Sequence, residues 1–265
     1  MLTPIFAATG RMIVDAATGA GQVVVLSSRA VLSLRQLHRV LRQLKFQIDM
    51  AGFGSLLVLA LISGLTGMIM VMQMGPTLQN YNALNTLGGI IGVTFCRELG
   101  PIWAAVIILA RVGSAMAAEL GTMKVNEEVE ALRVMSIDPV RYLVLPRIAA
   151  LVLVLPILVA IADVVGLAGG AMVANSLFEV PFSVFKSSAQ DFLELKDFFS
   201  GLIKGGVFGF IIGAIACKQG LSASGGAEGV GRVTTTTVRL CVIFVLVADL
   251  VLTSLLQHLL GGSMG

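Results

Sequence analysis

Residues 50–96 read MAGFGSLLVLALISGLTGMIMVMQMGPTLQNYNALNTLGGIIGVTFC and carry no charged side chain. As one straight helix, this stretch would be about 70 Å long, more than twice the hydrocarbon thickness of a bilayer. It must therefore fold back on itself, and Gly75-Pro76 with the polar residues that follow marks the reversal. The stretch predicts two membrane-spanning helices, over residues 50–75 and 87–118.

Charged residues are scarce along the whole chain, since 12% of its 265 residues are charged and 57% are hydrophobic. A soluble domain has about 25% charged residues, so a soluble fold and a disordered chain are both excluded. The net charge of +3 is not gathered into a patch that would bind nucleic acid. Three further apolar stretches predict spans over residues 148–176, 198–217 and 237–259. The expected fold is an all-α integral membrane protein with a five-span domain over residues 50–265.

The connections between the predicted spans differ in Lys and Arg content. The N-terminal stretch, the 119–147 loop and the 218–239 loop together hold thirteen basic residues, whereas the opposite side holds only Lys186 and Lys196. Because basic residues stay in cytoplasmic connections, the N-terminus is expected in the cytoplasm and the C-terminus outside, in the periplasm.

Residues 1–49 precede the first span and combine apolar residues at helical spacing with basic residues such as Arg35, Arg39 and Arg42. This pattern is typical of a basic helix that lies in the inner membrane interface, among acidic headgroups. The alternative is a cytoplasmic arm packed against the spans themselves.

Glycine recurs at every fourth position in the fourth predicted span, at Gly201, Gly205, Gly209 and Gly213. Such a stripe lets two helix backbones approach closely within lipid. It indicates either tight packing inside one bundle or a seam between two copies of the chain.

Six ionisable residues fall inside the predicted spans: Arg97, Glu98, Arg111, Asp163, Lys204 and Asp249. A charge at the bilayer centre costs at least about 2.5–3.5 kcal/mol, so each needs a partner or water. Pairing within the bundle is expected for Asp163, Arg111 and Asp249, while Lys204 is expected to extend outward to the interface. Arg97 and Glu98 are neighbours on a helix and point about 100° apart, so they cannot satisfy each other. Arg97 either holds a phosphate or pairs with a fixed acid such as Asp163 or Asp249.

Motifs of enzymatic chemistry are missing from the sequence. It contains no GxxxxGK[ST] or HExxH pattern, and its three cysteines, Cys96, Cys217 and Cys241, lack metal-ligand spacing. We therefore expect no catalytic residue, no metal site and no cofactor in this chain.

Residues 97–147 read RELGPIWAAVIILARVGSAMAAELGTMKVNEEVEALRVMSIDPVRYLVLPR. This segment resembles the core of the MlaE permease family, the membrane subunits of ABC transporters associated with Mce-domain proteins. The matching elements are RELGP at 97–101, ARVGSA at 110–115, AELG at 118–121, TTTTV at 234–238 and ADLVLT at 248–253.

The resemblance implies a lipid transporter assembled from several chains. Two permease copies form a homodimer, a separate cytoplasmic ABC ATPase hydrolyses ATP, and a hexamer of Mce-domain proteins sits over the outer face. Such a complex moves phospholipid between the inner membrane of a diderm bacterium and a carrier or the outer membrane, which maintains lipid asymmetry. The alternatives are uptake of sterols or other hydrophobic substrates, and a non-transporting scaffold for Mce subunits.

The resemblance also implies two sets of site residues. The residues that correspond to the lipid pocket are Arg97, Glu98, Leu99, Tyr81, Met70 and Leu78. Residues 122–137 resemble the helix that couples the permease to its ATPase, and the residues assigned to coupling are Glu119, Glu127, Glu130, Leu132 and Met135. An acidic amphipathic helix of this kind can dock in a groove of a partner. The alternative is a solvated loop helix.

Overall fold

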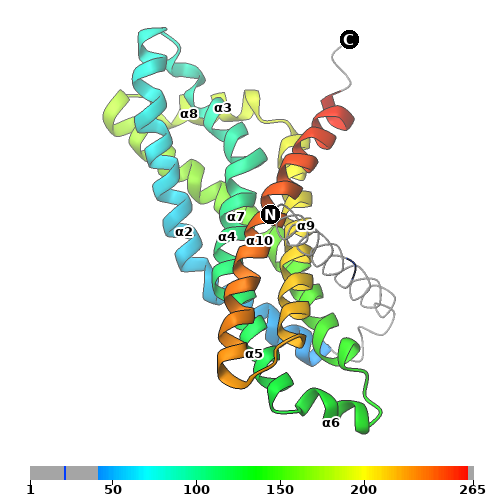
Figure 1. Ribbon diagram of the computed structural model, residues 1–265. Coiled ribbons are helices and arrows are strands. Elements are labelled where there is room, and N and C mark those ends of the chain that lie inside the picture. Colours follow the sequence, from blue (N-terminus) through cyan, green and yellow to red (C-terminus); the bar gives the residue numbers. More distant parts are fainter. Residues whose placement is uncertain (1–20, 22–40, 262–265) are drawn as a thin grey trace, which may run out of the picture.

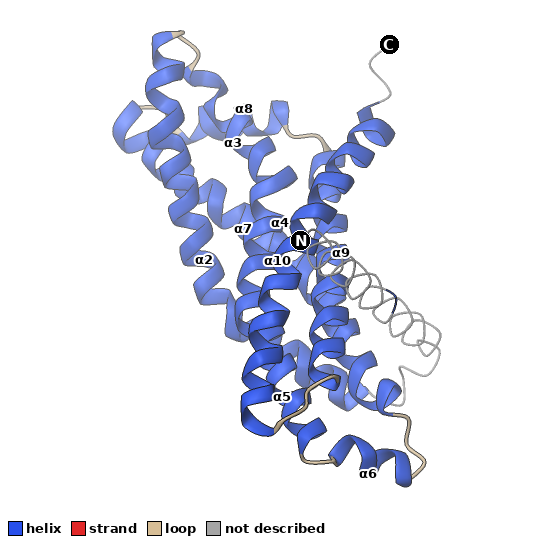
Figure 2. Cartoon of the chain, in the orientation of Figure 1, coloured by secondary structure: helices blue, strands red, loops and turns tan. Residues whose placement is uncertain are grey.

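The computed structural model describes residue 21 and residues 41–261, and every regular element in these residues is helical (Figures 1 and 2). Five of its helical segments are long and apolar enough to cross a membrane, which confirms the predicted fold class and number of spans. The segments cover Leu41–Asn80, Leu84–Val125, Val140–Phe178, Leu195–Leu221 and Gly226–His258.

Several of these spanning segments are built from more than one helical element. In chain order, the elements are α2 (Leu41–Asn80), η2 (Leu84–Thr86), α3 (Leu87–Thr94), η3 (Phe95–Leu99), α4 (Gly100–Ile108), η4 (Leu109–Gly113), α5 (Ser114–Val125), α6 (Glu128–Val134), η5 (Val140–Val144), α7 (Leu145–Phe178), α8 (Phe182–Phe192), α9 (Leu195–Leu221) and α10 (Gly226–Gly261). The second span therefore consists of η2, α3, η3, α4, η4 and α5 joined end to end.

The first helix does not break where the sequence suggested. Pro76 lies inside α2, which continues to Asn80, and the chain reverses only after it, at Asn82 with a left-handed φ of 52°. Gly75 has a packing role instead, because a Cβ there would collide with the Phe178 ring of α7. The prediction of a break at Gly75-Pro76 is wrong, since the glycine serves a helix contact, whereas the predicted reversal in the polar residues that follow is confirmed by the turn at Asn82.

Two turns of π-helix interrupt the second span. They are η3, with the sequence FCREL, and η4, with the sequence LARVG, and each contains an arginine, Arg97 or Arg111. A π-turn adds a residue to the helical turn and rotates the side chains that follow, and it is frequent at functional sites. Both intramembrane arginines of this span therefore lie where the regular helix is perturbed.

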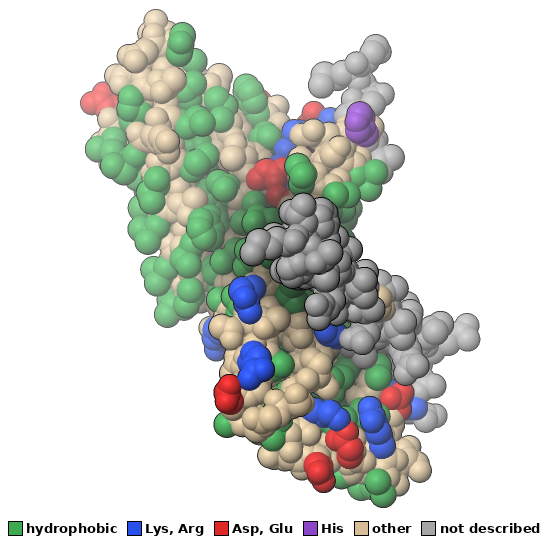
Figure 3. Space-filling model, viewed as in Figure 1, with side chains coloured by type: hydrophobic (Ala, Val, Ile, Leu, Met, Phe, Trp, Pro, Cys, Tyr) green, Lys and Arg blue, Asp and Glu red, His purple; other side chains and the backbone are tan. Residues whose placement is uncertain are grey.

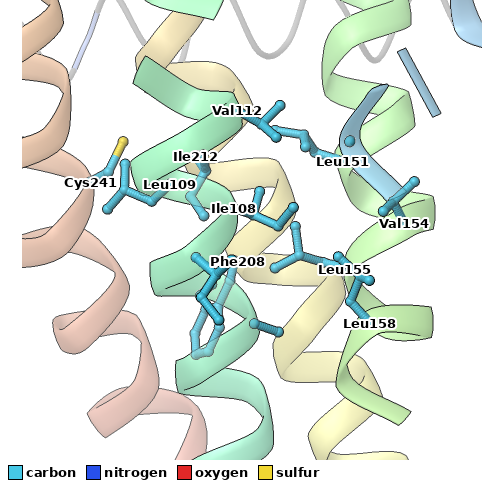
Figure 4. Packing of buried hydrophobic residues seen from close by; sticks show 14 of the residues in the cluster. Ile108, Leu109, Val112, Leu151, Val154, Leu155, Leu158, Phe208, Ile212 and Cys241 are labelled. Atoms are coloured by element: carbon cyan, nitrogen blue, oxygen red, sulfur yellow. The ribbon is translucent and has the colours of Figure 1, made fainter. Parts of the chain in front are cut away.

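The core lies where α7 packs between α2, α4 and α9. Figure 4 shows side chains from α4, η4, α7, α9 and α10 meeting in one apolar cluster, in which Ile108, Leu155 and Phe208 are completely buried. Glycines allow the close approach: a Cβ at Gly67 of α2 would meet the carbonyl of Gly166, and one at Gly209 of α9 would meet that of Leu151. These glycine stripes therefore pack helices within one chain.

Two short helices lie at opposite ends of the bundle (Figure 1). The sequence pattern did not predict α8, which packs beside α3, where the Gly89 amide donates to Ser188 Oγ at 3.0 Å. The other is α6, in the segment predicted to couple to an ATPase. On the face shown in Figure 3, most charged side chains gather at the end that holds α5 and α6.

The N-terminal prediction lies largely outside the described residues. Residues 41–49 form the first turns of α2, so Arg42 and Lys45 belong to the same helix as the first span. An interfacial helix over the preceding residues stays a prediction.

Candidate functional site

Lys204 of α9 is the centre of a buried polar cluster. Its side chain is 1% exposed, and its Nζ donates to Glu98 Oε2 at 2.8 Å and to Thr253 Oγ1 at 2.7 Å. The same ammonium pairs with Asp249 Oδ1 at 2.8 Å and donates to the Arg97 carbonyl at 2.8 Å. The expectation that Lys204 extends outward is wrong, because carboxylates from η3 and α10 surround it. The expected pairing of Asp249 is confirmed.

The RELGP motif explains why Lys204 reaches a backbone carbonyl. In an α-helix, the Arg97 carbonyl would accept a hydrogen bond from the residue four positions later, which is Pro101 and has no N–H. The Lys204 ammonium supplies the missing donor. Thr253 completes the network by donating to Glu98 Oε1 at 3.0 Å. One lysine thus joins the second, fourth and fifth spans.

Arg97 pairs with Asp197 rather than with either acid expected from the sequence. Its Nε donates to Asp197 Oδ1 at 2.7 Å, and its Nη2 lies 2.7 Å from the same oxygen. Asp197 was missed because it precedes the predicted span by one residue. The signal was present in the sequence, since Glu194 and Asp197 form a capping box at the start of α9.

The Arg97 side chain remains 41% exposed, whereas that of Asp197 is 4% exposed. Asp197 therefore binds Arg97 from inside the protein, and the remaining N–H groups of the guanidinium are accessible. A planar guanidinium held in this way can bind a phosphate or carboxylate through two parallel hydrogen bonds.

The other two intramembrane charges do not form the expected pairs. Asp163 is 2% exposed, and neither carboxylate oxygen has a hydrogen-bond partner among the described residues. Arg111 bonds to a serine, with Nη1 donating to Ser55 Oγ at 3.1 Å. Pairwise neutralisation thus fails as an account of these two residues.

The apolar residues assigned to the lipid pocket lie in one cluster. Met70, Leu78 and Leu99 are partly buried and pack around Phe95 and its neighbours, whereas Tyr81 is 78% exposed just after α2. Leu99 belongs to the same π-turn as Arg97 and Glu98. The structure thus places an apolar cluster beside a half-exposed cation, and lipid contact by these residues stays a prediction.

The coupling segment is two helices rather than one. It turns at Glu127, which has a left-handed φ of 61°, between the end of α5 and the start of α6. Val129 is buried and Leu132 partly buried in the apolar cluster beneath, whereas Met135 is 60% exposed. Val129 and Leu132 therefore form the apolar side of α6, and Met135 lies outside it because α6 ends at Val134.

The acids of this segment have different surroundings. Glu127 is exposed, whereas Glu130 accepts a hydrogen bond from Lys124 that lowers the pKa of its carboxyl. Glu119 pairs with the buried Arg147 at 2.8 Å, and Arg147 also donates to the Leu143 carbonyl at 2.9 Å. Glu119 therefore braces the two ends of the segment, on α5 and α7. Of these acids, Glu127 is the one most available to a partner.

An open cavity of about 370 Å³ lies beside Glu127. It is lined by residues of the α5–α6 turn and of the loop before α10, namely Lys124, Val125, Glu127, Glu130, Ala223, Ser224, Gly225 and Gly226.

Five helical segments long enough to span a membrane, with a buried polar cluster between them and the α5–α6 hairpin at one end, define a multi-pass membrane protein. The chain belongs to the permease MlaE family, whose family model matches residues 44–255. It is 37% identical to a probable ABC transporter permease protein of Rickettsia typhi, over 97% of this chain and 99% of that protein. It is 43% identical to another of Synechocystis sp., over 72% of this chain and 73% of that protein.

A plant relative is also similar. The chain is 35% identical to the chloroplastic protein TRIGALACTOSYLDIACYLGLYCEROL 1 of Arabidopsis thaliana, over 88% of this chain and 66% of that protein. As a permease of the ABC class, the chain is a transmembrane subunit and is not itself the ATPase.

Proposed function

We propose that this chain moves phospholipid between the inner membrane of a diderm bacterium and an Mce-type carrier, as one of two permease copies driven by separate ATPase subunits. Family membership supports the permease role, and the lipid in the name of the plant relative favours a lipid substrate. A hexamer of Mce-domain proteins on the outer face is part of the proposal.

One observation carries the choice of phospholipid: Arg97 is a cation at membrane depth that is 41% exposed while its other side is held by Asp197. A lipid phosphate would satisfy the exposed donors through charge-assisted hydrogen bonds. Its acyl chains would lie along the adjacent cluster that contains Met70, Leu78 and Leu99. Glu98, fixed by Lys204, would orient the headgroup from the next position on η3.

The proposed orientation places α6 in the cytoplasm and the C-terminus in the periplasm. It is supported by the concentration of Lys and Arg on the α6 side of the bundle. Glu127 and the exposed part of α6 would then face the ATPase. In intact cells, an impermeant thiol reagent should label a single cysteine at position 186 and not one at position 124.

Two alternatives make different demands on the site. A sterol or another neutral hydrophobic substrate would leave the exposed donors of the Arg97 guanidinium, those not bound to Asp197, without an anionic acceptor. A scaffold for Mce subunits would need neither the exposed cation nor an exposed acid at the turn before α6. The exposed Arg97 guanidinium and the exposed Glu127 carboxylate therefore both favour phospholipid transport.

The test is to purify the full chain with its native partners and to identify the bound lipid by mass spectrometry. Phospholipid at about one molecule or more per permease copy is the expected result. Sterol or another neutral lipid in its place would favour the alternative substrate, and a complex with neither lipid nor ATPase would favour the scaffold.

A further inference from the structure

Arg111 lies inside the second span and forms no ion pair with any described residue. Its Nη1 donates to Ser55 Oγ at 3.1 Å, and the side chain is exposed. A serine hydroxyl does not neutralise a guanidinium, and an arginine within a span needs an anion or water. Arg97, by contrast, forms an ion pair with the Asp197 carboxylate.

The surface of α2 is shaped to receive this guanidinium. A Cβ on Gly54 would collide with Nη1, Nη2 and Cζ of Arg111, so the side chain occupies the space that this glycine leaves. The neighbouring Ser55 is completely buried and accepts one of the five guanidinium N–H groups. The space above Gly54 and the hydrogen bond to Ser55 therefore place the guanidinium against α2, while most of its donors remain for a ligand.

The two arginines of the second span lie on opposite sides of its midpoint. The span covers Leu84–Val125, so Arg97 and Arg111 are each about seven residues from its centre. At 1.5 Å per residue, this places each about 10 Å from the centre. If the centre of the span lies at the membrane midpoint, with a hydrocarbon core that extends about 15 Å to either side, Arg111 lies about 5 Å inside the boundary that faces α6. An arginine side chain can span that distance to the headgroup layer.

We propose that Arg111, positioned by Gly54 and Ser55, binds the phosphate of a phospholipid in the leaflet next to α6. The inference rests on the proposed phospholipid function and adds a second phosphate site, across the membrane midpoint from Arg97. The acyl chains would lie along the apolar surface of α2 that flanks Gly54, where Phe53 is 78% and Leu57 is 72% exposed.

The other ligand to consider is a carboxylate from a second copy of the chain. Three acids of the spans are held within each copy, on the Arg97 side of the midpoint. Glu98 and Asp249 surround Lys204, and Asp163 is 2% exposed. None of these three acids therefore lies at the depth of Arg111, and pairing with the exposed Asp49 of a second copy is an outcome that the test distinguishes.

The test measures binding of phosphatidylglycerol to the full chain by native mass spectrometry, with diacylglycerol of the same acyl chains as the phosphate-free probe. Gly54→Ala displaces the guanidinium without changing any charge, and Arg111→Gln removes the charge. Gly52→Ala is the matched control on the same helix, because its Cβ would meet only Val154 Cγ1, at 3.9 Å.

We expect two phosphate-dependent lipids per wild-type chain. Arg111→Gln should lose one of them, Gly54→Ala should weaken one about tenfold, and Gly52→Ala should bind like the wild type. The lipid at Arg97 should persist in all three variants. If Arg111→Gln folds poorly, the comparison of Gly54→Ala with Gly52→Ala decides whether binding of the second lipid depends on the position of the Arg111 guanidinium.

Unchanged phosphatidylglycerol binding in Gly54→Ala and Arg111→Gln would overturn the inference. So would unchanged binding combined with dissociation of two copies, which would assign Arg111 to a contact between copies. If binding depends on Arg97 alone, the second site is wrong and the proposed function stands. If the wild-type chain binds no phosphatidylglycerol, both are wrong.

Discussion

The Lys204 cluster and the α5–α6 hairpin are both held by ion pairs, but the two regions differ in solvent access. The Lys204 side chain is 1% exposed, with carboxylates from two other spans around it. In the hairpin, the paired side chains of Lys124 and Glu130 are 29% and 40% exposed. Water can replace a lost partner in the hairpin, but it reaches the Lys204 cluster poorly. The ion pairs of the Lys204 cluster therefore fix the spans relative to one another, whereas the Lys124–Glu130 pair only orients side chains on the surface of the hairpin.

The largest effect is expected from Lys204→Met, which leaves Glu98 and Asp249 facing each other without their cation. Breaking a buried pair by removing one partner costs about 3–5 kcal/mol. We expect a large loss of folded protein in detergent, measured by a thermal melt of the purified chain.

The control is Lys186→Met, at an exposed position on α8, which should melt like the wild type. A triple variant, Lys204→Met with Glu98→Gln and Asp249→Asn, should recover much of the stability because these three positions no longer carry a charge. If the Lys204→Met chain is as stable as the control, water reaches the cluster and solvates the two carboxylates.

An intermediate effect is expected at the brace between α5 and α7. Glu119→Gln removes the carboxylate from Arg147, whose side chain is 5% exposed, but the Leu143 carbonyl still accepts from the arginine. A hydrogen bond to a charged group contributes about 1.5–3 kcal/mol, so the loss of stability should fall below that of Lys204→Met. If Glu119→Gln and Lys204→Met lower the melting temperature by the same amount, the expected difference between a buried and a half-exposed ion pair is wrong.

The smallest effect on stability is expected from Glu127→Lys, because this acid is exposed and the Lys124–Glu130 pair remains. A surface substitution of this kind changes stability by about 0.5 kcal/mol or less. The ATPase should nevertheless be lost from the purified complex if Glu127 contacts it. Full retention of the ATPase and of lipid-stimulated hydrolysis would remove Glu127 from the interface, and Glu128→Lys on the neighbouring exposed position serves for comparison.

The sequence was sufficient for the features that depend on composition and local pattern. Apolar length predicted five spans, and acids next to apolar residues predicted a helix where α6 lies. Helix ends were less predictable: Gly75-Pro76 resembles a break, yet the glycine makes room for Phe178 and the helix continues. The α8 helix was missed because it is short and amphipathic and its sequence contains no long apolar stretch.

The pairing of the site charges could not be predicted, because it depends on helix rotation. The π-turn at η3 changes the direction of Arg97 and Glu98 relative to a regular helix, so an α-helical wheel gives the wrong neighbours. Glu98 and Lys204 are far apart in the sequence and meet only through packing of the second and fourth spans. Pro101 was the one local clue, since it removes the usual donor to the Arg97 carbonyl.

The most direct test of the central claim is to measure phospholipid and folded yield together in Arg97→Ala and in the double variant Arg97→Ala with Asp197→Ala. The single variant strands the buried Asp197, so its yield should fall, whereas the double variant removes both charges and should recover yield. If Arg97 binds lipid phosphate, the double variant recovers its yield but still lacks the one phospholipid per chain that Arg97 holds. Recovery of both yield and phospholipid would show that Arg97 serves only to neutralise Asp197, and would contradict the lipid site.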